Sequence, residues 1–248
     1  MGEDVHPLLS IDRVRKSYWR GARETVVLAD ISLEVHAGEF VAIWGQRGAG
    51  KTTLAAVAAG LETPDEGSVH VNGRDLAQTR RGLVSLLHEA IGWVQRVGPK
   101  SGEFRTVVDY VALPLLGTLS PRVARRRASA MLKRLGIADC ANEPWKCLTD
   151  SERTLVAIAH ALVRGPSLLI ADDPTASLNV LQREEVMGLL RLAADEEQLG
   201  VLITVPDMPD MAYADRVGSL SDGRLVVRRR TPEDRGKVLD FPRNEQSA

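Results

Sequence analysis

A short glycine-rich stretch, GQRGAGKTT, constrains the fold of this 248-residue chain more than any other feature. It matches the pattern G-x-x-x-x-G-K-[ST] from Gly45 to Thr52, and it lies between an apolar run, EFVAIW, and a run rich in alanine and leucine, KTTLAAVAAG. In such a loop the glycines let backbone N–H groups wrap around a phosphate, and the start of the following helix adds partial positive charge. We therefore expect a strand, a phosphate-binding loop (P-loop) and a helix in that order.

The side chains of this loop suit a nucleotide. Lys51 is expected to reach the β- and γ-phosphates, and the hydroxyl of Thr52 can bind Mg²⁺. The expected phosphate-binding residues are Gly45, Gln46, Arg47, Gly48, Ala49, Gly50, Lys51, Thr52 and Thr53.

A second signal is a pair of adjacent acids. The apolar run LLIA ends abruptly in Asp172 and Asp173, followed by a proline. In a P-loop fold, a strand beside the loop ends in an acid that holds Mg²⁺ through water, and Asp172 fits that role. The next position often carries the carboxylate that polarises the attacking water, and here it is Asp173.

The order of the apolar runs predicts the fold class. Strand-like and helix-like segments alternate, and the segment from about 106 to 162 is helical and rich in arginine. We expect an α/β protein with a P-loop NTPase (RecA-like) core sheet, an N-terminal antiparallel β subdomain and a helical subdomain inserted at about 98–162. One domain should span 8–228, and 229–248 should be a polar, flexible tail.

Composition excludes several classes. The net charge of −1 gives no overall field that would recruit nucleic acid, so no nucleic-acid partner is expected. Two cysteines, Cys140 and Cys147, do not make a disulfide framework and suit reduced thiols. No run approaches the ~18 apolar residues of a membrane-spanning helix, and the N-terminus does not have the pattern of a signal peptide. A cytoplasmic protein is expected.

Several motifs in order carry a resemblance to a known family. After the P-loop and the helical insertion come LTDSERTLVAIAHAL, LLIADDPTASLN and YADRVGSLSDGRLV. This order resembles the nucleotide-binding subunit of ABC transporters over nearly all of 8–228, and TVVDYVALPLL is similar to the lipoprotein-release and macrolide-export branch. The resemblance implies that two such subunits enclose two ATP molecules, each ATP lying between one P-loop and the signature helix of the other subunit.

The resemblance also implies partners and a place in the cell. An integral membrane permease and a second ATP-binding subunit, identical or different, are expected at the inner face of the cell membrane. Tyr18 matches the aromatic residue that stacks on adenine, although a half-buried strand tyrosine is the alternative. Gln95 is the candidate that senses Mg²⁺. The usual branch pattern puts Arg96 in that slot, so Gln95 serves only if its strand ends one residue sooner.

The family signature, usually L-S-G-G-[QE], reads Leu148-Thr149-Asp150-Ser151-Glu152 here. Thr149 and Ser151 are the expected contacts to the partner's ATP. Asp150 puts a negative charge where a triphosphate arrives, which at about 4 Å costs roughly 1 kcal/mol in water-like surroundings and roughly 4 kcal/mol at an effective dielectric of 20. A local alternative is that Thr149 and Glu152 form a capping box for the following helix.

Three further departures concern catalysis. Asp173 stands where the family has glutamate, Pro206 stands at the switch histidine, and Asn179 replaces a loop aspartate. Two hypotheses follow. The first is the ATP-binding subunit of a membrane exporter with slow hydrolysis. The alternative is a non-hydrolysing regulatory subunit that binds ATP and clamps a membrane partner. The absence of a coiled-coil insertion and of a second P-loop argues against a chromosome- or ribosome-associated ABC protein.

Overall fold

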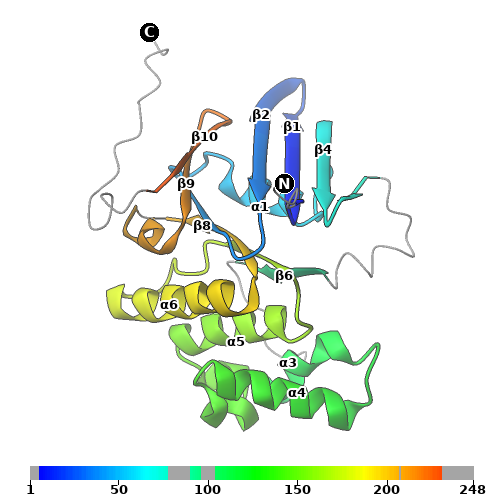
Figure 1. Cartoon of the computed structure of the whole chain (residues 1–248), viewed down its shortest axis with the longest axis vertical. Helices are drawn as coiled ribbons and strands as arrows, with labels where there is room; N and C mark the ends of the chain where they lie inside the picture. Colours follow the sequence, from blue (N-terminus) through cyan, green and yellow to red (C-terminus); the bar gives the residue numbers. More distant parts are fainter. Residues whose placement is uncertain (1–5, 78–89, 96–103, 207, 231–248) are drawn as a thin grey trace, which may run out of the picture.

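The computed structural model describes residues 6–77, 90–95, 104–206 and 208–230 (Figure 1). An antiparallel sheet lies at one end of the molecule, a mixed sheet crosses its middle, and the helices α3 to α6 lie at the other end. The expected α/β fold with an antiparallel subdomain is confirmed, and the helices α3, α4 and α5 lie where the sequence predicts an insertion. The part of that prediction at 98–103 lies outside the described residues.

The antiparallel sheet has the strand order β2-β1-β4-β5. Its hairpin between β4 and β5 turns at Asn72 and Gly73, whose φ angles are 50° and 73°. Both residue types accept this left-handed backbone, as an Asn-Gly turn requires. The strands are β1 (Leu9–Arg20), β2 (Arg23–Val35), β4 (Glu66–Val71) and β5 (Arg74–Asp75).

The central sheet has the order β10-β9-β3-β8-β7-β6. All its pairs are parallel except β9 with β10. β7 and β8 are buried along their whole length, which explains their continuous apolar runs. The strands are β3 (Phe40–Trp44), β6 (Ile91–Val94), β7 (Leu168–Asp172), β8 (Gly200–Val205), β9 (Arg216–Ser221) and β10 (Arg224–Arg229).

Helices cover the rest of the fold. Along α4, the alanines and the leucine spaced by four residues, Ala124, Ala128 and Leu132, are buried, and the arginine-rich face is exposed. The helices are α1 (Lys51–Ala58), α3 (Val107–Ala112), α4 (Pro121–Arg134), α5 (Asp150–Leu162) and α6 (Val180–Glu197). Short 3₁₀ turns are η1 (Leu113–Leu115), η2 (Ala138–Asn142), η3 (Trp145–Cys147) and η4 (Met208–Tyr213).

The central sheet separates two apolar layers. Phe40 and Ala42 of β3 pack with the helices α3, α4, α5 and α6, whereas Val41 and Ile43 of the same strand pack with α1 and the antiparallel sheet. Because successive side chains of a strand point to opposite faces, a slip of one residue would exchange these two sets. Burial on both faces therefore determines the register of the strands that carry the site.

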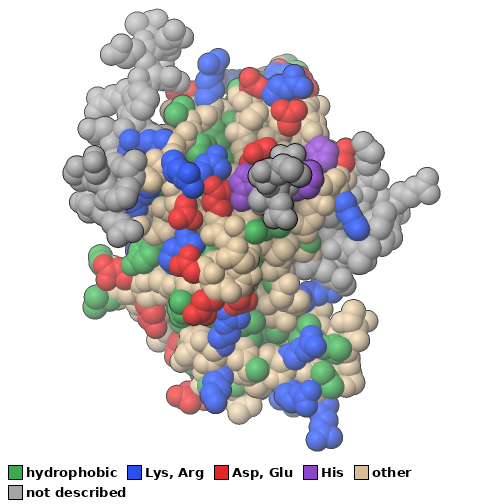
Figure 2. All heavy atoms as spheres, viewed as in Figure 1, with side chains coloured by type: hydrophobic (Ala, Val, Ile, Leu, Met, Phe, Trp, Pro, Cys, Tyr) green, Lys and Arg blue, Asp and Glu red, His purple; other side chains and the backbone are tan. Residues whose placement is uncertain are grey.

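The outer surface mixes charges of both signs, as Figure 2 shows for the face it views. None of the helices in the described residues has both the length and the apolar character needed to cross a membrane. Both cysteines are free, as the sequence predicts. At the C-terminal end, β10 continues through Arg229, and the backbone N–H of Arg230 donates to the carbonyl of Asp215 at 2.8 Å. The described chain thus continues through Arg230, and 231–248 lie outside the described residues.

The start of α5 forms the capping box expected as the local alternative. The hydroxyl oxygen of Thr149 accepts a hydrogen bond from the backbone N–H of Glu152 at 3.3 Å. In return, the Glu152 carboxylate accepts from the backbone N–H and the hydroxyl of Thr149 at 2.7 and 2.8 Å. These bonds hold the pKa of Glu152 below its usual value, the backbone bond contributing most. The hydroxyl proton of Thr149 is therefore engaged within its own helix.

Thr149→Ala should lower the free energy of unfolding by about 1 kcal/mol, because the helix loses its N-cap acceptor. Urea denaturation followed by circular dichroism, without nucleotide, measures this change. The matched control is Ser129→Ala on the exposed face of α4, which should not destabilise the protein. Equal stability of Thr149→Ala and the parent chain would contradict a stabilising role for the capping box.

Candidate functional site

The P-loop connects β3 to α1 through backbone conformations that need glycine. Gly48 and Gly50 have φ angles of 87° and 100°. A Cβ on Gly50 would lie 2.9 Å from Val27, and a Cβ on Gly45 would lie 2.5 Å from the carbonyl oxygen of Leu220. Neither position has room for a side chain, so the loop keeps the bare backbone that a phosphate cradle requires.

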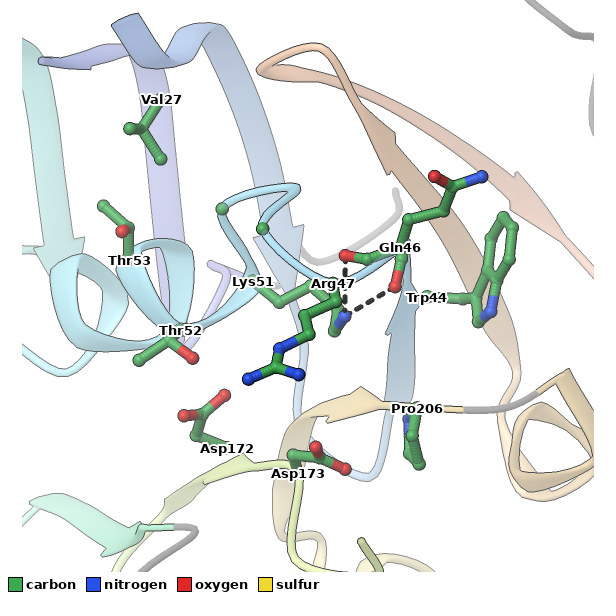
Figure 3. A pocket seen from close by; sticks show the side chains of 13 residues that line it. Val27, Trp44, Gln46, Arg47, Lys51, Thr52, Thr53, Asp172, Asp173 and Pro206 are labelled. Carbon is green, nitrogen blue, oxygen red and sulfur yellow. Dashed lines mark hydrogen bonds between the residues drawn. The ribbon is translucent and has the colours of Figure 1, made fainter. Parts of the chain in front are cut away.

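Lys51, the first residue of α1, points back across this loop (Figure 3). Its ammonium group donates hydrogen bonds to the carbonyl oxygens of Gly45 at 2.5 Å and of Gln46 at 3.2 Å. These contacts hold the positive charge inside the curve of the loop, where the backbone N–H groups would surround a phosphate.

A pocket of about 750 Å³ opens over the loop. All loop residues from Gly45 to Thr53 except Ala49 line it, together with Val27, Trp44, Asp172, Asp173 and Pro206. The ends of β3, β7 and β8 therefore meet at one place, as expected for parallel strands whose carboxyl ends share an edge. The sequence reasoning missed Val27 and Trp44. Trp44 ends the strand before the P-loop, and that position was the available signal.

Asp172 and Asp173 are held by a third residue that the sequence reasoning also missed. The hydroxyl of Thr204 donates to the Asp172 carboxylate at 2.8 Å. The backbone N–H of Asp173 donates to the hydroxyl and the carbonyl oxygen of Thr204 at 2.9 and 3.1 Å. All three residues are buried. A single hydroxyl in the otherwise apolar strand LITV could have indicated this partner, since a buried hydroxyl needs a hydrogen bond.

The donor set fits a Mg²⁺ ion that arrives with phosphates. No group of three or more His, Cys, Asp or Glu side chains that could hold a metal occurs among the described residues. Mg²⁺ is commonly bound by one or two carboxylates, by substrate phosphates and by several waters. Asp172 and the hydroxyl of Thr52 lie in the same pocket, so they suit this partial coordination rather than a complete protein cage.

Gln95 lies at the same edge of the sheet. β6 ends at Val94, which pairs with Ala171 of β7, so Gln95 is the first residue after its strand and is level with Asp172. β6 ends before Gln95, and the role of Gln95 stays a prediction. Arg96 lies outside the described residues. Gln95 is exposed, and it does not line the described pocket.

Tyr18 of β1 stands beside the start of α1. Its hydroxyl donates to Glu62 at 2.6 Å and lies 3.4 Å from the hydroxyl of Thr53, a pocket residue. Burial and this bond raise the pKa of Tyr18, burial contributing most. The residue is 40% exposed, and the ammonium group of Lys16 lies over its ring at 5.7 Å from the centroid. No local pattern of residues indicated the contact with Glu62.

Of the signature residues, Thr149 is the N-cap of α5, and Asp150 and Ser151 are its first two residues. None of the three lines the described pocket. Asp150 is paired: its carboxylate accepts a hydrogen bond from Arg153, one helical turn later, at 3.2 Å. The carboxylate that was treated as a lone charge in the sequence analysis therefore has a cationic neighbour in this structure. The i,i+3 spacing of the two residues was a readable signal that the sequence reasoning did not use.

The two remaining departures have different surroundings. Pro206 follows β8 and lines the pocket, where its ring offers no hydrogen-bond donor (Figure 3). Asn179 instead caps α6. Its side-chain oxygen accepts a hydrogen bond from the backbone N–H of Gln182 at 3.1 Å, and the side-chain oxygen of Gln182 accepts one from the backbone N–H of Asn179 at 3.1 Å. Replacing the loop aspartate thus leaves a well-capped helix.

The chain is similar to known proteins along most of its length. The family model described as ABC transporter matches residues 28–176. The lipoprotein-releasing system ATP-binding protein LolD of Pseudomonas syringae is 38% identical over 224 residues, which cover 88% of this chain and 97% of that protein. The macrolide export ATP-binding/permease protein MacB of Nitrobacter winogradskyi is 33% identical over 89% of this chain, but the match spans only 34% of MacB.

Solved structures give the same result. A dimeric structure of the ATP-binding cassette MJ0796 bound to ADP and Pi has a TM-score of 0.82 and 28% identity, covering 89% of this chain and 98% of that chain. CbiO1 from Clostridium perfringens, part of the complex cbiONQ, has a TM-score of 0.76 and 29% identity, covering 89% and 87%. Sequence family, fold and pocket agree, and the chain belongs to the ABC transporter family as an ATP-binding subunit.

Proposed function

We propose that this chain binds ATP with Mg²⁺ at the P-loop pocket and couples closure of a cassette dimer to an integral membrane permease, with slow hydrolysis. The observation that carries the proposal is the meeting of Lys51 and Thr52 with Asp172 in one pocket. The likeness to LolD and MacB, whose names refer to lipoprotein release and macrolide export, supports an exporter. The expected location is the cytoplasmic side of the cell membrane.

Each group in the pocket has a separate task. Lys51 neutralises charge on the β- and γ-phosphates, and the P-loop backbone surrounds them. Thr52 and Asp172 hold the metal, with Gln95 as a further ligand at the same edge. Bound Mg²⁺ would act as a Lewis acid on the phosphoryl oxygens. Tyr18 offers the face of its ring to adenine, which an aromatic contact stabilises by about 0.5–1.5 kcal/mol.

Slow hydrolysis is inferred from two groups. Asp173 is in place to polarise water, but its carboxylate is set back by about 1 Å relative to glutamate, and small misplacements can lower the rate a hundredfold. Its backbone is held by Thr204, so the main chain cannot readily advance to compensate. Pro206 offers no donor to the γ-phosphate.

The same pocket favours one alternative, a regulatory subunit that binds ATP without hydrolysing it and clamps a membrane partner. Pro206 is the observation behind it, because a pocket without the switch donor can still hold nucleotide. Turnover of ATP by the purified chain with its co-purifying membrane partner separates the two. Steady phosphate release supports the transporter ATPase, and stable binding without release supports the clamp.

The positions of the departures from the family pattern bear on whether the second subunit of the dimer is identical to this chain or different. In a homodimer, each ATP site would combine this chain's Asp173 and Pro206 with this chain's altered signature at Thr149, Asp150 and Ser151. In a heterodimer with an intact second ATP-binding subunit, those departures would fall in different sites. One site would then bind ATP firmly and hydrolyse it slowly, while the other would keep intact chemistry. A heterodimer is favoured slightly if ATP is turned over.

Lys51→Ala should abolish measurable Mg-ATP binding, because Lys51 carries the main positive charge for the β- and γ-phosphates. Isothermal titration calorimetry measures the affinity. Lys133→Ala, an exposed lysine near the end of α4, is the control and should bind as the parent chain does. Unchanged affinity in Lys51→Ala would refute the P-loop assignment.

Asp173→Glu should raise ATP turnover only modestly, since Pro206 still lacks a donor. Adding Pro206→His should give more than the product of the two single effects, because groups that act as one unit are not additive. Phosphate release measures the rates. Asp222→Glu is the control, since Asp222 has the same left-handed backbone as Asp173 (φ of 50° and 49°) outside the pocket. Parent turnover already near 1–10 per second would contradict an impaired site.

Two opposite substitutions test the signature pair. Asp150→Gly removes the carboxylate and leaves Arg153 unpaired, so the local charge becomes positive and Mg-ATP-dependent dimerisation should increase. Arg153→Gln leaves Asp150 unpaired and should decrease it. Light scattering with and without Mg-ATP measures both. Equal behaviour of the two variants would show that this helix end does not face a nucleotide.

A further inference from the structure

One pocket residue has a side chain that the P-loop pattern does not explain. Arg47 occupies a variable position of the loop, between Gln46 and Gly48, and it lines the same pocket as Lys51. In Figure 3 its guanidinium extends from the loop toward the ends of Asp172 and Asp173, on the side of the pocket where the carboxylates lie. Lys51, by contrast, remains folded against the loop.

The guanidinium of Arg47 has its donors free for a ligand. The side chain is exposed, and among the described residues no hydrogen bond or ion pair holds it. Arginine carries five N–H donors in a planar fork that matches two phosphate oxygens at once. An unengaged fork at the mouth of a phosphate pocket can therefore bind without first breaking an internal contact.

The charges of the pocket indicate which phosphate it would meet. The charged side chains that line it in the described chain are Lys51 and Arg47, which are positive, and Asp172 and Asp173, which are negative. Lys51 sits within the curve of the loop, so it serves the phosphates that the backbone surrounds. Arg47 extends past it toward the aspartates, where the far end of a triphosphate would lie.

The same end of the pocket lacks another donor. Pro206 lines it and has neither a side-chain donor nor a backbone N–H. A terminal phosphate there would have the two aspartates beside it and a proline ring in place of a hydrogen-bonding group. Mg²⁺ held at Asp172 would balance one of these acids, and Arg47 is the pocket side chain whose positive charge would balance the other.

We propose that Arg47 is a second cationic contact to the terminal phosphate of the bound nucleoside triphosphate and gives this pocket its preference for ATP over ADP. This inference rests on the proposed function. Because ADP lacks the phosphate that Arg47 would contact, loss of the guanidinium should affect the two nucleotides differently. A cation that only increased the general attraction of the pocket for anions would change the affinities for ATP and ADP alike.

The test is the ratio of the affinities for Mg-ATP and Mg-ADP, measured on the full chain by isothermal titration calorimetry. Arg47→Gln should weaken Mg-ATP binding about tenfold to a hundredfold, the usual range for a lost charged hydrogen bond, and change Mg-ADP binding less than about threefold. The Mg-ATP affinity of Arg47→Lys should lie between those of the parent chain and Arg47→Gln, since lysine keeps the positive charge but lacks the planar fork of donors. Arg122→Gln, an exposed arginine on α4, should leave both affinities unchanged.

The other outcomes are equally decisive. Equal losses for both nucleotides, or no loss in Arg47→Gln, would overturn the assignment of Arg47 to the terminal phosphate. A change in turnover with an unchanged affinity ratio would also overturn it, and would place Arg47 beside Asp173 as a positioning group instead. If the parent chain binds neither nucleotide, the proposed function itself fails, so the two failures are distinguishable.

Discussion

The parallel pairing of β3, β8 and β7 is the constraint on which the site depends. It brings the end of the strand before the P-loop, the end of the strand with Asp172, and Thr204 to one edge of the sheet. The strands hold this register because each buries apolar side chains on both faces, and a slip of one residue would put Asp172 on the wrong side. The edge of the sheet that lines the pocket is thus positioned by apolar packing elsewhere in the core.

The fold and the central part of the site could be predicted because their signals are local. The P-loop pattern and the run LLIA before Asp172 each lie within about ten residues, and each implies a strand end. Val27 could not be placed, because it lies on another strand, far from the P-loop along the chain. Trp44 and Thr204 had local signals, but those signals did not identify the residues that they would face across the fold. Gln95 could be predicted only in part. Its motif is local, but its role depends on where β6 ends, and the pairing of β6 with β7 determines that end.

In the signature segment, the same residues match two patterns: a capping box within their own helix and a contact to the ATP of a second subunit. The spacing of Thr149 and Glu152 forms a capping box, and the structure satisfies it completely. That local solution uses the threonine hydroxyl, so the group that would have replaced the signature serine already has a partner. Ser151 remains the other hydroxyl of the segment. Beside it, the carboxylate of Asp150 is paired with Arg153.

Charge balance connects the departures from the family pattern. At the P-loop, two cations face two carboxylates, and at the signature one arginine neutralises one aspartate. In the pocket, Arg47 accompanies Asp172 and Asp173. In the signature segment, Arg153 accompanies Asp150. Binding depends mainly on this balance of charge, whereas hydrolysis also requires reach and a donor at particular points. A site can therefore keep its affinity for ATP after its carboxylate has been shortened and its histidine position filled by proline, which is why the proposed function combines ATP binding with slow hydrolysis.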